Sequence, residues 1–137
     1  RVLKVLKDEQ NYGLNTIEAY DNFQKQSEEI RSNFLSFLYK AREDNKKVYA
    51  YGAAAKGNTL INYAGVKDDL ILGVADNAKS KQNKYLPGSH IPIISPSQLI
   101  EKQPDSIIIL PWNLINELRG QFKKYEVVTA IPNLKIW

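Results

Sequence analysis

The sequence predicts an α/β fold in which helices cover both faces of a mostly parallel, five-stranded sheet. From residue 47 onward, short and almost wholly apolar segments alternate with amphipathic ones. Continuous apolar strands separated by helices are typical of parallel sheets that are buried on both faces. Because crossovers between such strands are right-handed, this order indicates a doubly wound, Rossmann-like arrangement. An amphipathic stretch before residue 47 predicts one long helix ahead of the sheet.

The chain before the sheet is expected to contain a linker and then the start of the domain. We interpret residues 1–15 as a linker from an upstream domain, with a short helix at residues 2–7. Residues 16–137 form the domain itself, whose long helix covers residues 16–44 and whose βα core covers residues 46–137.

The long helix has recognisable start and packing signals. Asn15 or Thr16 is expected to cap it, with Glu18 in its first turn. Apolar residues then recur at helical spacing, so they share one face that should pack on the sheet. These residues are Ile30, Phe34, Phe37, Leu38 and Ala41.

Strands and helices are expected to alternate within the core. The five predicted strands are residues 47–51, 70–76, 91–94, 105–110 and 126–131. The predicted helices are residues 56–64, 95–102 and 113–124. The second of these helices has the clearest start, because Ser95 can cap it, Pro96 occupies its first position and Gln98 completes a capping box. Residues 77–90 have no helical stripe, and we expect a long loop there that serves binding.

Composition excludes several classes of protein. The 137 residues include no cysteine, which rules out disulfides, thiolate metal sites and cysteine nucleophiles. No apolar run approaches the roughly 18 residues of a membrane span, and no signal peptide is readable, so we expect a cytoplasmic protein. The chain also lacks methionine, even at position 1, and we interpret it as part of a longer protein.

The net charge of +4 is concentrated in the second part of the chain. Lys79, Lys81 and Lys84 form a cluster within the expected long loop. Such a cluster is either a solvated face or a set of contacts for an anionic small ligand. Nucleic acid is disfavoured as a partner, because the sequence has no arginine-rich stripe and no aromatic RNA-binding signature.

The loop GAAAKG after the first strand partly matches the dinucleotide-binding fingerprint. That fingerprint uses three glycines, for a tight turn, for the approach of the pyrophosphate and for helix–strand contact. Gly52 and Gly57 occupy the first and third positions, but Ala54 replaces the middle glycine. Asp76 stands near the position of the ribose-binding acid. The loop is therefore either an anion site, in which backbone N–H groups and Lys56 attract a phosphate, or a tight turn built from small residues.

Other candidate residues follow the remaining strands, because open parallel sheets bind ligands outside the carboxyl ends of their strands. They include Asp76 after the second strand and the Trp112-Asn113 pair after the fourth. Each has a structural alternative: Asp76 as a cap or turn residue, Trp112 as a plug of the sheet's edge, and Asn113 as the N-cap of the next helix. His90, the only histidine, is expected at the surface or in a structural role, and no catalytic acid–base pair is readable.

Three motifs stand in a fixed order along the chain: VYAYGAAAKGNTLINYAGV, VADNAKSKQNKYLPGSHIPI and PDSIIILPWNLINEL. Together they resemble the C-terminal domain of the S-adenosylmethionine (SAM)-dependent sugar C-methyltransferases, which act on deoxysugar nucleotides. The resemblance covers about residues 8–137. Position by position, it includes residues 52–58, 76, 81–82, 85–88, 91–93 and 111–113.

The resemblance implies a three-part parent protein, with a zinc-binding part and a methyltransferase domain ahead of a Rossmann-like C-terminal domain. The zinc ligands, the SAM site and the catalytic histidine region belong to the first two parts, so no cofactor is expected in this chain. The C-terminal domain is expected to close over the nucleotide sugar. This sequence departs from the family at Asn77-Ala78, usually Asn-Pro, and at Asn83-Lys84, usually Gly-Arg, which bears on the sugar or phosphate group recognised.

We therefore expect the substrate-positioning domain of an enzyme that transfers methyl from SAM to a carbon next to a sugar ketone, with the isolated chain inactive. The expected partners are a nucleotide sugar and the upstream methyltransferase domain, with homodimer formation left open and no membrane contact. Two alternatives remain: a non-catalytic interaction or dimerisation module, and the NAD-binding half of an oxidoreductase. The predicted substrate-binding residues are Gly52, Ala53, Ala54, Lys56, Gly57, Asn58, Asp76, Lys81, Lys84, Tyr85, Trp112 and Asn113.

Overall fold

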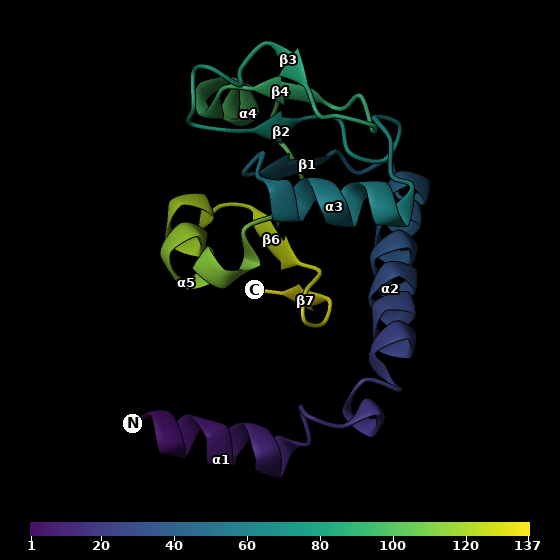
Figure 1. The fold of residues 1–137 in the computed structure, drawn as a ribbon. Helices are drawn as coiled ribbons and strands as arrows, with labels where there is room; N and C mark the ends of the chain where they lie inside the picture. The colour runs from purple at the N-terminus through teal and green to yellow at the C-terminus, as the bar shows by residue number, and fades with distance from the viewer.

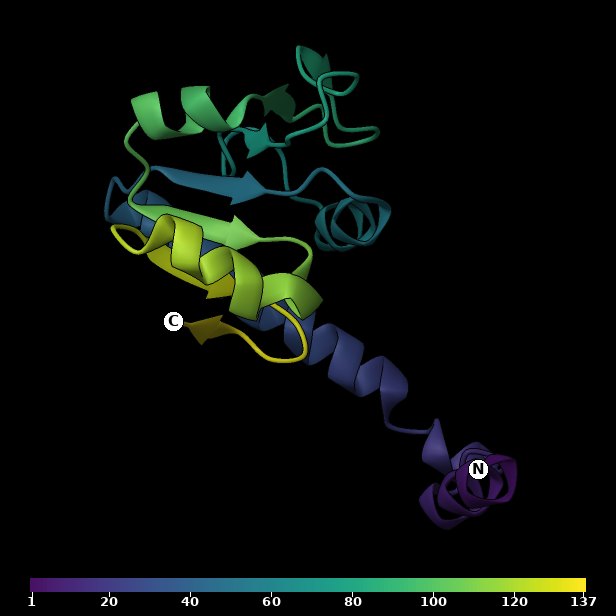
Figure 2. The same ribbon diagram turned by 90° about the vertical axis from the view of Figure 1, so that its left-hand side faces the viewer.

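The computed structural model describes residues 1–137 as an N-terminal arm (residues 1–22) and an α/β body (residues 23–137), as Figure 1 shows. The arm contains helix α1 (Val2–Tyr12) and the 3-10 helix η1 (Ile17–Ala19). The helices of the body are α2 (Phe23–Glu43), α3 (Ala55–Ala64), α4 (Pro96–Glu101) and α5 (Ile115–Leu118). Two views at a right angle both show α1 standing away from the sheet (Figure 1, Figure 2).

Seven strands form one mixed sheet in the order β3-β4-β2-β1-β5-β6-β7. The strands are β1 (Val48–Tyr51), β2 (Val74–Ala75), β3 (Lys84–Tyr85), β4 (Pro92–Ile94), β5 (Ser106–Ile109), β6 (Glu126–Thr129) and β7 (Lys135–Ile136). The five central strands run parallel in the 3-2-1-4-5 order of a doubly wound fold, and the two edge strands run antiparallel to their neighbours. The α/β fold is confirmed, whereas the prediction of a five-stranded sheet is wrong.

The sequence prediction missed the edge strands because both are short and exposed. β3 lies inside the segment expected to be a loop and pairs Lys84 with Ile93. β7 pairs Ile136 with Val128 near the end of the chain. Both residues of each edge strand are exposed, so no buried apolar run marks them. Conversely, the strand predicted at residues 70–76 pairs as β2 only over its last part.

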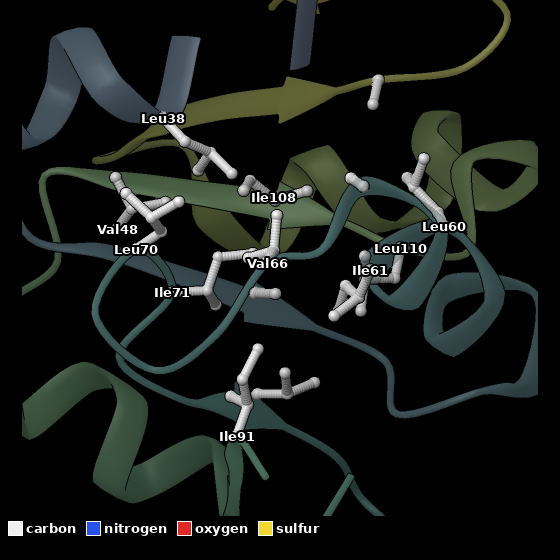
Figure 3. Packing of buried hydrophobic residues seen from close by; sticks show 14 of the residues in the cluster. Leu38, Val48, Leu60, Ile61, Val66, Leu70, Ile71, Ile91, Ile108 and Leu110 are labelled. Atoms are coloured by element: carbon white, nitrogen blue, oxygen red, sulfur yellow. The ribbon is translucent and has the colours of Figure 1, made fainter. Parts of the chain in front are cut away.

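Side chains of the central strands alternate between two apolar layers. Val48 and Ile108 face the layer that contains α2 and α3, whereas Tyr49 and Ile107 face the layer that contains α4 and α5. Figure 3 shows the larger layer, in which Leu38 of α2 lies beside Ile108 of the sheet. Because both faces are covered, the strands appear in the sequence as continuous apolar runs.

The long helix predicted at residues 16–44 begins only at Phe23. Thr16 does not cap it, because Asn22 occupies the N-cap position of α2. The Oγ1 of Thr16 donates a hydrogen bond to the carbonyl of Gly13 at 3.0 Å. The chain forms the single turn η1 there and then turns again before α2 starts. The predicted apolar stripe is nevertheless confirmed in its buried members, Phe34, Leu38 and Ala41.

Two other helices show how local signals fix helix ends. α1 extends beyond the predicted residues 2–7 and ends at Gly13, whose φ of 78° is left-handed. Ser95 caps α4 in a capping box with Gln98, as predicted.

The helix predicted at residues 113–124 is broken into η2 (Trp112–Leu114), α5 and η3 (Arg119–Phe122). Gly120 lies in its interior, where glycine costs about 1 kcal/mol relative to alanine in an α-helix.

None of the helices combines the length and the apolar character that crossing a membrane requires.

Candidate functional site

The strand order reverses between β1 and β5, which makes this the switch point where doubly wound folds bind ligands. The loops that follow these two strands touch there. Gly52 follows β1 with a φ of 93°, and a Cβ atom placed on it would lie 2.5 Å from Cδ of Pro111, which follows β5. Position 52 therefore requires glycine, and the contact joins the two loops where dinucleotide-binding folds leave a crevice.

The first turn of α3 follows this contact and carries free backbone donors. Gly57 packs against Leu110, the residue after β5, because a Cβ atom on it would lie 2.6 Å from Cβ of Leu110. Ala54 is the N-cap residue and makes no side-chain capping bond. The N–H groups of Ala55, Lys56 and Gly57 have no acceptor within the chain. Such donors at the positive end of a helix attract anions.

Asp76 holds the loop after β1 in place. Its Oδ2 accepts hydrogen bonds from the N–H of Ala53 at 2.8 Å and from Nζ of Lys81 at 3.1 Å. Its Oδ1 accepts one from the N–H of Ala78 at 2.8 Å. Nζ of Lys81 also donates to the carbonyl of Ala53 at 2.8 Å. Asp76 is thus a turn residue, as one of its alternatives predicted, and with Lys81 it braces the loop.

Tyr51, the last residue of β1, lies near the same carboxylate. Its hydroxyl accepts a hydrogen bond from Nδ2 of Asn77 at 2.9 Å. Burial raises the pKa of the Tyr51 phenol, the charge of Asp76 raises it further, and the hydrogen bond from Asn77 lowers it in part. Burial also raises the pKa of Tyr49. Both phenols therefore stay neutral in a pH range where free tyrosine begins to ionise.

Lys56, Trp112 and Asn113 meet across the switch point. Nζ of Lys56 donates a hydrogen bond to Oδ1 of Asn113 at 2.7 Å and lies 5.0 Å from the centre of the Trp112 ring. Asn113 is not a helix N-cap, because the turn η2 already begins at Trp112. These contacts bring three of the predicted site residues together and tie the loop after β1 to the loop after β5.

A hollow of about 450 Å³, which we call the loop hollow, lies between the first turn of α3 and the segment 77–90. Oδ1 of Asn58 is buried and has no hydrogen-bond partner. Lys79 does not line this hollow, although it belongs to the lysine cluster in the sequence. Six of the predicted residues do line it: Ala53, Ala54, Asn58, Lys81, Lys84 and Tyr85.

A second space of about 450 Å³, which we call the α2–α3 groove, lies on another side of α3. Lys56 and Trp112 are the predicted residues that line it. Sequence reasoning missed Thr59 and Tyr63, which line it as well. Helical spacing could have found them, because residues 56, 59 and 63 are separated by three and four positions and share one helix face.

The remaining polar candidates form no further cluster. No three His, Cys, Asp or Glu side chains lie together in a way that could hold a metal ion. His90 is exposed at the end of the segment 77–90.

The fold and this edge of the sheet define a doubly wound α/β domain with two ligand-sized hollows around one helix start. The family model described as C-methyltransferase C-terminal domain matches residues 1–132, and the chain belongs to this family. C-methyltransferase NovU from Streptomyces niveus is 32% identical to the chain over 124 residues. The match covers 90% of this chain and 30% of NovU, so the chain spans less than a third of that relative's length.

Proposed function

We propose that this chain is the substrate-positioning domain of a SAM-dependent C-methyltransferase that acts on a nucleotide-linked deoxysugar. The complete enzyme would remove a proton from a carbon next to a sugar ketone and transfer methyl to that carbon. In this proposal SAM and zinc bind to other domains of the protein. The present chain holds the substrate in a fixed orientation, which lowers the entropic cost of the reaction. The isolated chain is expected to transfer no methyl group.

The observation that carries this proposal is the loop hollow at the carboxyl edge of the sheet. Its volume of about 450 Å³ lies within the usual range for small-molecule sites. One side of it is the first turn of α3, whose N–H groups have no acceptor. Lys84 adds a positive charge, and Asn58 and Tyr85 add polar side chains to the lining. These groups suit a ligand that combines phosphate with hydroxyl groups.

The residues of the edge then divide into two roles. Asp76 and Lys81 maintain the loop, because their polar atoms bond within the chain. Asn58, Lys84 and Tyr85 are the residues that we assign to substrate contact.

Calorimetric titration of the 137-residue chain with a dTDP-linked deoxysugar, free dTDP and NAD tests the proposal. We expect the nucleotide sugar and dTDP to bind and NAD to bind far more weakly. Lys84→Ala should weaken binding of the nucleotide sugar roughly fivefold, because it removes one charge-assisted contact. Lys79→Ala is the matched control, since Lys79 is an exposed lysine of the same segment outside the hollow. Equal affinities for the two variants would remove the loop hollow from the site.

The interaction-module alternative is favoured by the arm. Val2, Leu3 and Ile17 are 72, 81 and 77% exposed, and α1 buries no residue. We propose the upstream methyltransferase domain of the same protein as the partner of this surface. A chain that binds no nucleotide but dimerises with rising concentration, measured by sedimentation, would favour a pure interaction module instead.

The NAD-binding alternative has less support. Ala54 places a methyl group where the fingerprint has its middle glycine. Both oxygens of Asp76 already accept hydrogen bonds within the chain. Binding of NAD alone in the same titration would reverse this assignment.

A further inference from the structure

We propose that the α2–α3 groove binds the base of the nucleotide, while the loop hollow receives the sugar. This inference rests on the proposed function, and it assigns the two halves of one substrate to two sides of α3.

The groove is built at the same edge of the sheet as the loop hollow. Ile30 of α2 and Tyr63 of α3 contribute to its walls, together with Lys56 from the first turn of α3. Trp112 follows β5 and Ile131 follows β6, so the groove lies beside the carboxyl ends of these strands. Its volume of about 450 Å³ is sufficient for a base and its ribose.

The chemistry of the groove suits an anion that carries a planar ring. Trp112 and Tyr63 are aromatic and only partly buried, so their rings can contact a base. Lys56 is the single charged residue that lines the groove, and its Nζ lies 5.0 Å from the centre of the Trp112 ring. A cation beside an aromatic wall is complementary to a base that is linked to phosphate.

The other polar side chains of the groove already donate hydrogen bonds within the chain. Oγ1 of Thr59 donates to the carbonyl of Ala55 at 3.0 Å, and Oγ of Ser27 donates to the carbonyl of Phe23 at 2.9 Å. Nε2 of Gln24 donates to Oε1 of Glu28 at 2.8 Å. Few donors therefore remain to read the edge of a base or the hydroxyls of a sugar. Recognition by stacking should make the groove tolerant of different bases.

The loop hollow has the complementary chemistry. Asn58 contributes a polar side chain to its lining, and Lys84 and Tyr85 are exposed polar residues. The first turn of α3 connects the two spaces, because Ala55 lines the hollow and Lys56 lines the groove. If the pyrophosphate of a nucleotide sugar binds to the free N–H groups of that turn, the base of the nucleotide lies on one side of α3 and the sugar lies on the other.

Fluorescence of Trp112 tests this assignment directly. The chain has two tryptophans, so Trp137→Phe leaves Trp112 as the only reporter. In this background we expect dTDP and UDP to change the Trp112 emission more than inorganic pyrophosphate does, because pyrophosphate can reach Lys56 but cannot stack on the ring. Tyr63→Leu should weaken dTDP binding roughly fivefold or more, because it removes a stacking surface, while pyrophosphate affinity stays the same. Tyr39→Leu is the matched control, since Tyr39 and Tyr63 are both 43% exposed and Tyr39 lies outside the groove.

The outcomes separate this inference from the proposed function. Unchanged dTDP affinity in Tyr63→Leu with silent Trp112 emission would overturn the assignment of the base. The proposed function would survive that result if the nucleotide sugar still bound and Lys84→Ala still weakened it. Absence of binding by every nucleotide and nucleotide sugar would overturn both.

Discussion

The arm and the α/β body differ in what their apolar side chains contact. No residue of the arm is buried, and its valines, leucines and isoleucine stand in solvent. In the body, similar side chains fill two apolar layers on the two faces of the sheet. Because burial of apolar surface is the main stabilising term in folding, the body contains its own source of stability and the arm does not.

The family match makes this difference informative. It runs from residue 1 to residue 132 and so includes both regions. A segment that shares the family's pattern but adds nothing to the domain's core is expected to act outside that core. Contact with the rest of a longer protein, as proposed above, accounts for apolar residues that this chain leaves exposed.

The largest effect should come from one substitution made in both regions. Ile108→Ala removes a fully buried side chain from β5 and should lower the free energy of unfolding by about 2–5 kcal/mol. Ile17→Ala makes the same change at a residue that is 77% exposed and should cost less than about 0.5 kcal/mol. Urea denaturation of both variants measures the contrast. Similar losses would mean that the arm packs on the body in solution.

A second contrast compares a nearly buried ion pair with an exposed one. Asp76→Asn removes the negative charge that faces Lys81 and one acceptor oxygen of a nearly buried side chain. It should lower the free energy of unfolding by about 2 kcal/mol. Asp69→Asn breaks the pair with Arg42, whose side chains are more than half exposed, and should cost about 0.5 kcal/mol or less. Denaturation in low and high salt measures both. A larger effect at Asp69 would show that Asp76 does not brace the loop.

The sequence predicted those parts of the fold that have strong local signals. The parallel strands were found because both of their faces are buried, and α4 was found because Ser95 and Gln98 form a capping box. The edge strands were missed because cross-strand pairing, and not local composition, defines them. The start of α2 was misplaced because the capping signal at Thr16 precedes the short turn η1 and the long helix begins only at Phe23.

The candidate site was predicted as a set of residues but not as an arrangement. Spacing found the loop after β1, yet it could not show that Asp76 and Lys81 bond to each other or that Lys56 reaches Asn113. The contact between Lys56 and Asn113 joins residues 57 positions apart and depends on the strand order. The contact between Asp76 and Lys81 spans only five positions, but it depends on how the segment after β2 folds back. Helical spacing places Tyr63 on the same face of α3 as Lys56, but it does not show that α2 lies beside that face and completes a groove, so Tyr63 was missed.

A smaller change in the free energy of unfolding is expected at high pH, and it comes from Tyr51 in the body. The folded state raises the pKa of Tyr51, so above pH about 10 the unfolded chain loses this proton before the folded chain does. Stability is therefore retained below that pH and falls as the pH rises through the window up to the raised pKa. Between pH 8 and pH 11, Tyr51→Phe should lose less free energy of unfolding than the unsubstituted chain. Urea denaturation at several pH values measures both losses. An equal loss in both would assign the decline to other groups.

The smallest expected effect tests the arm directly. Replacing Leu3, Leu6 and Ile17 together by glutamine removes exposed apolar surface and keeps good helix propensity within α1. The free energy of unfolding should change by less than about 0.5 kcal/mol, because no buried contact is lost. Any self-association of the unsubstituted chain, measured by sedimentation at two concentrations, should decrease in the variant. Replacing Lys4 and Asp8 by glutamine is the control, because it changes the same helix without removing apolar surface. If the apolar variant lost as much free energy of unfolding as Ile108→Ala, the arm would have to pack on the body. Its apolar surface would then not be available to a partner.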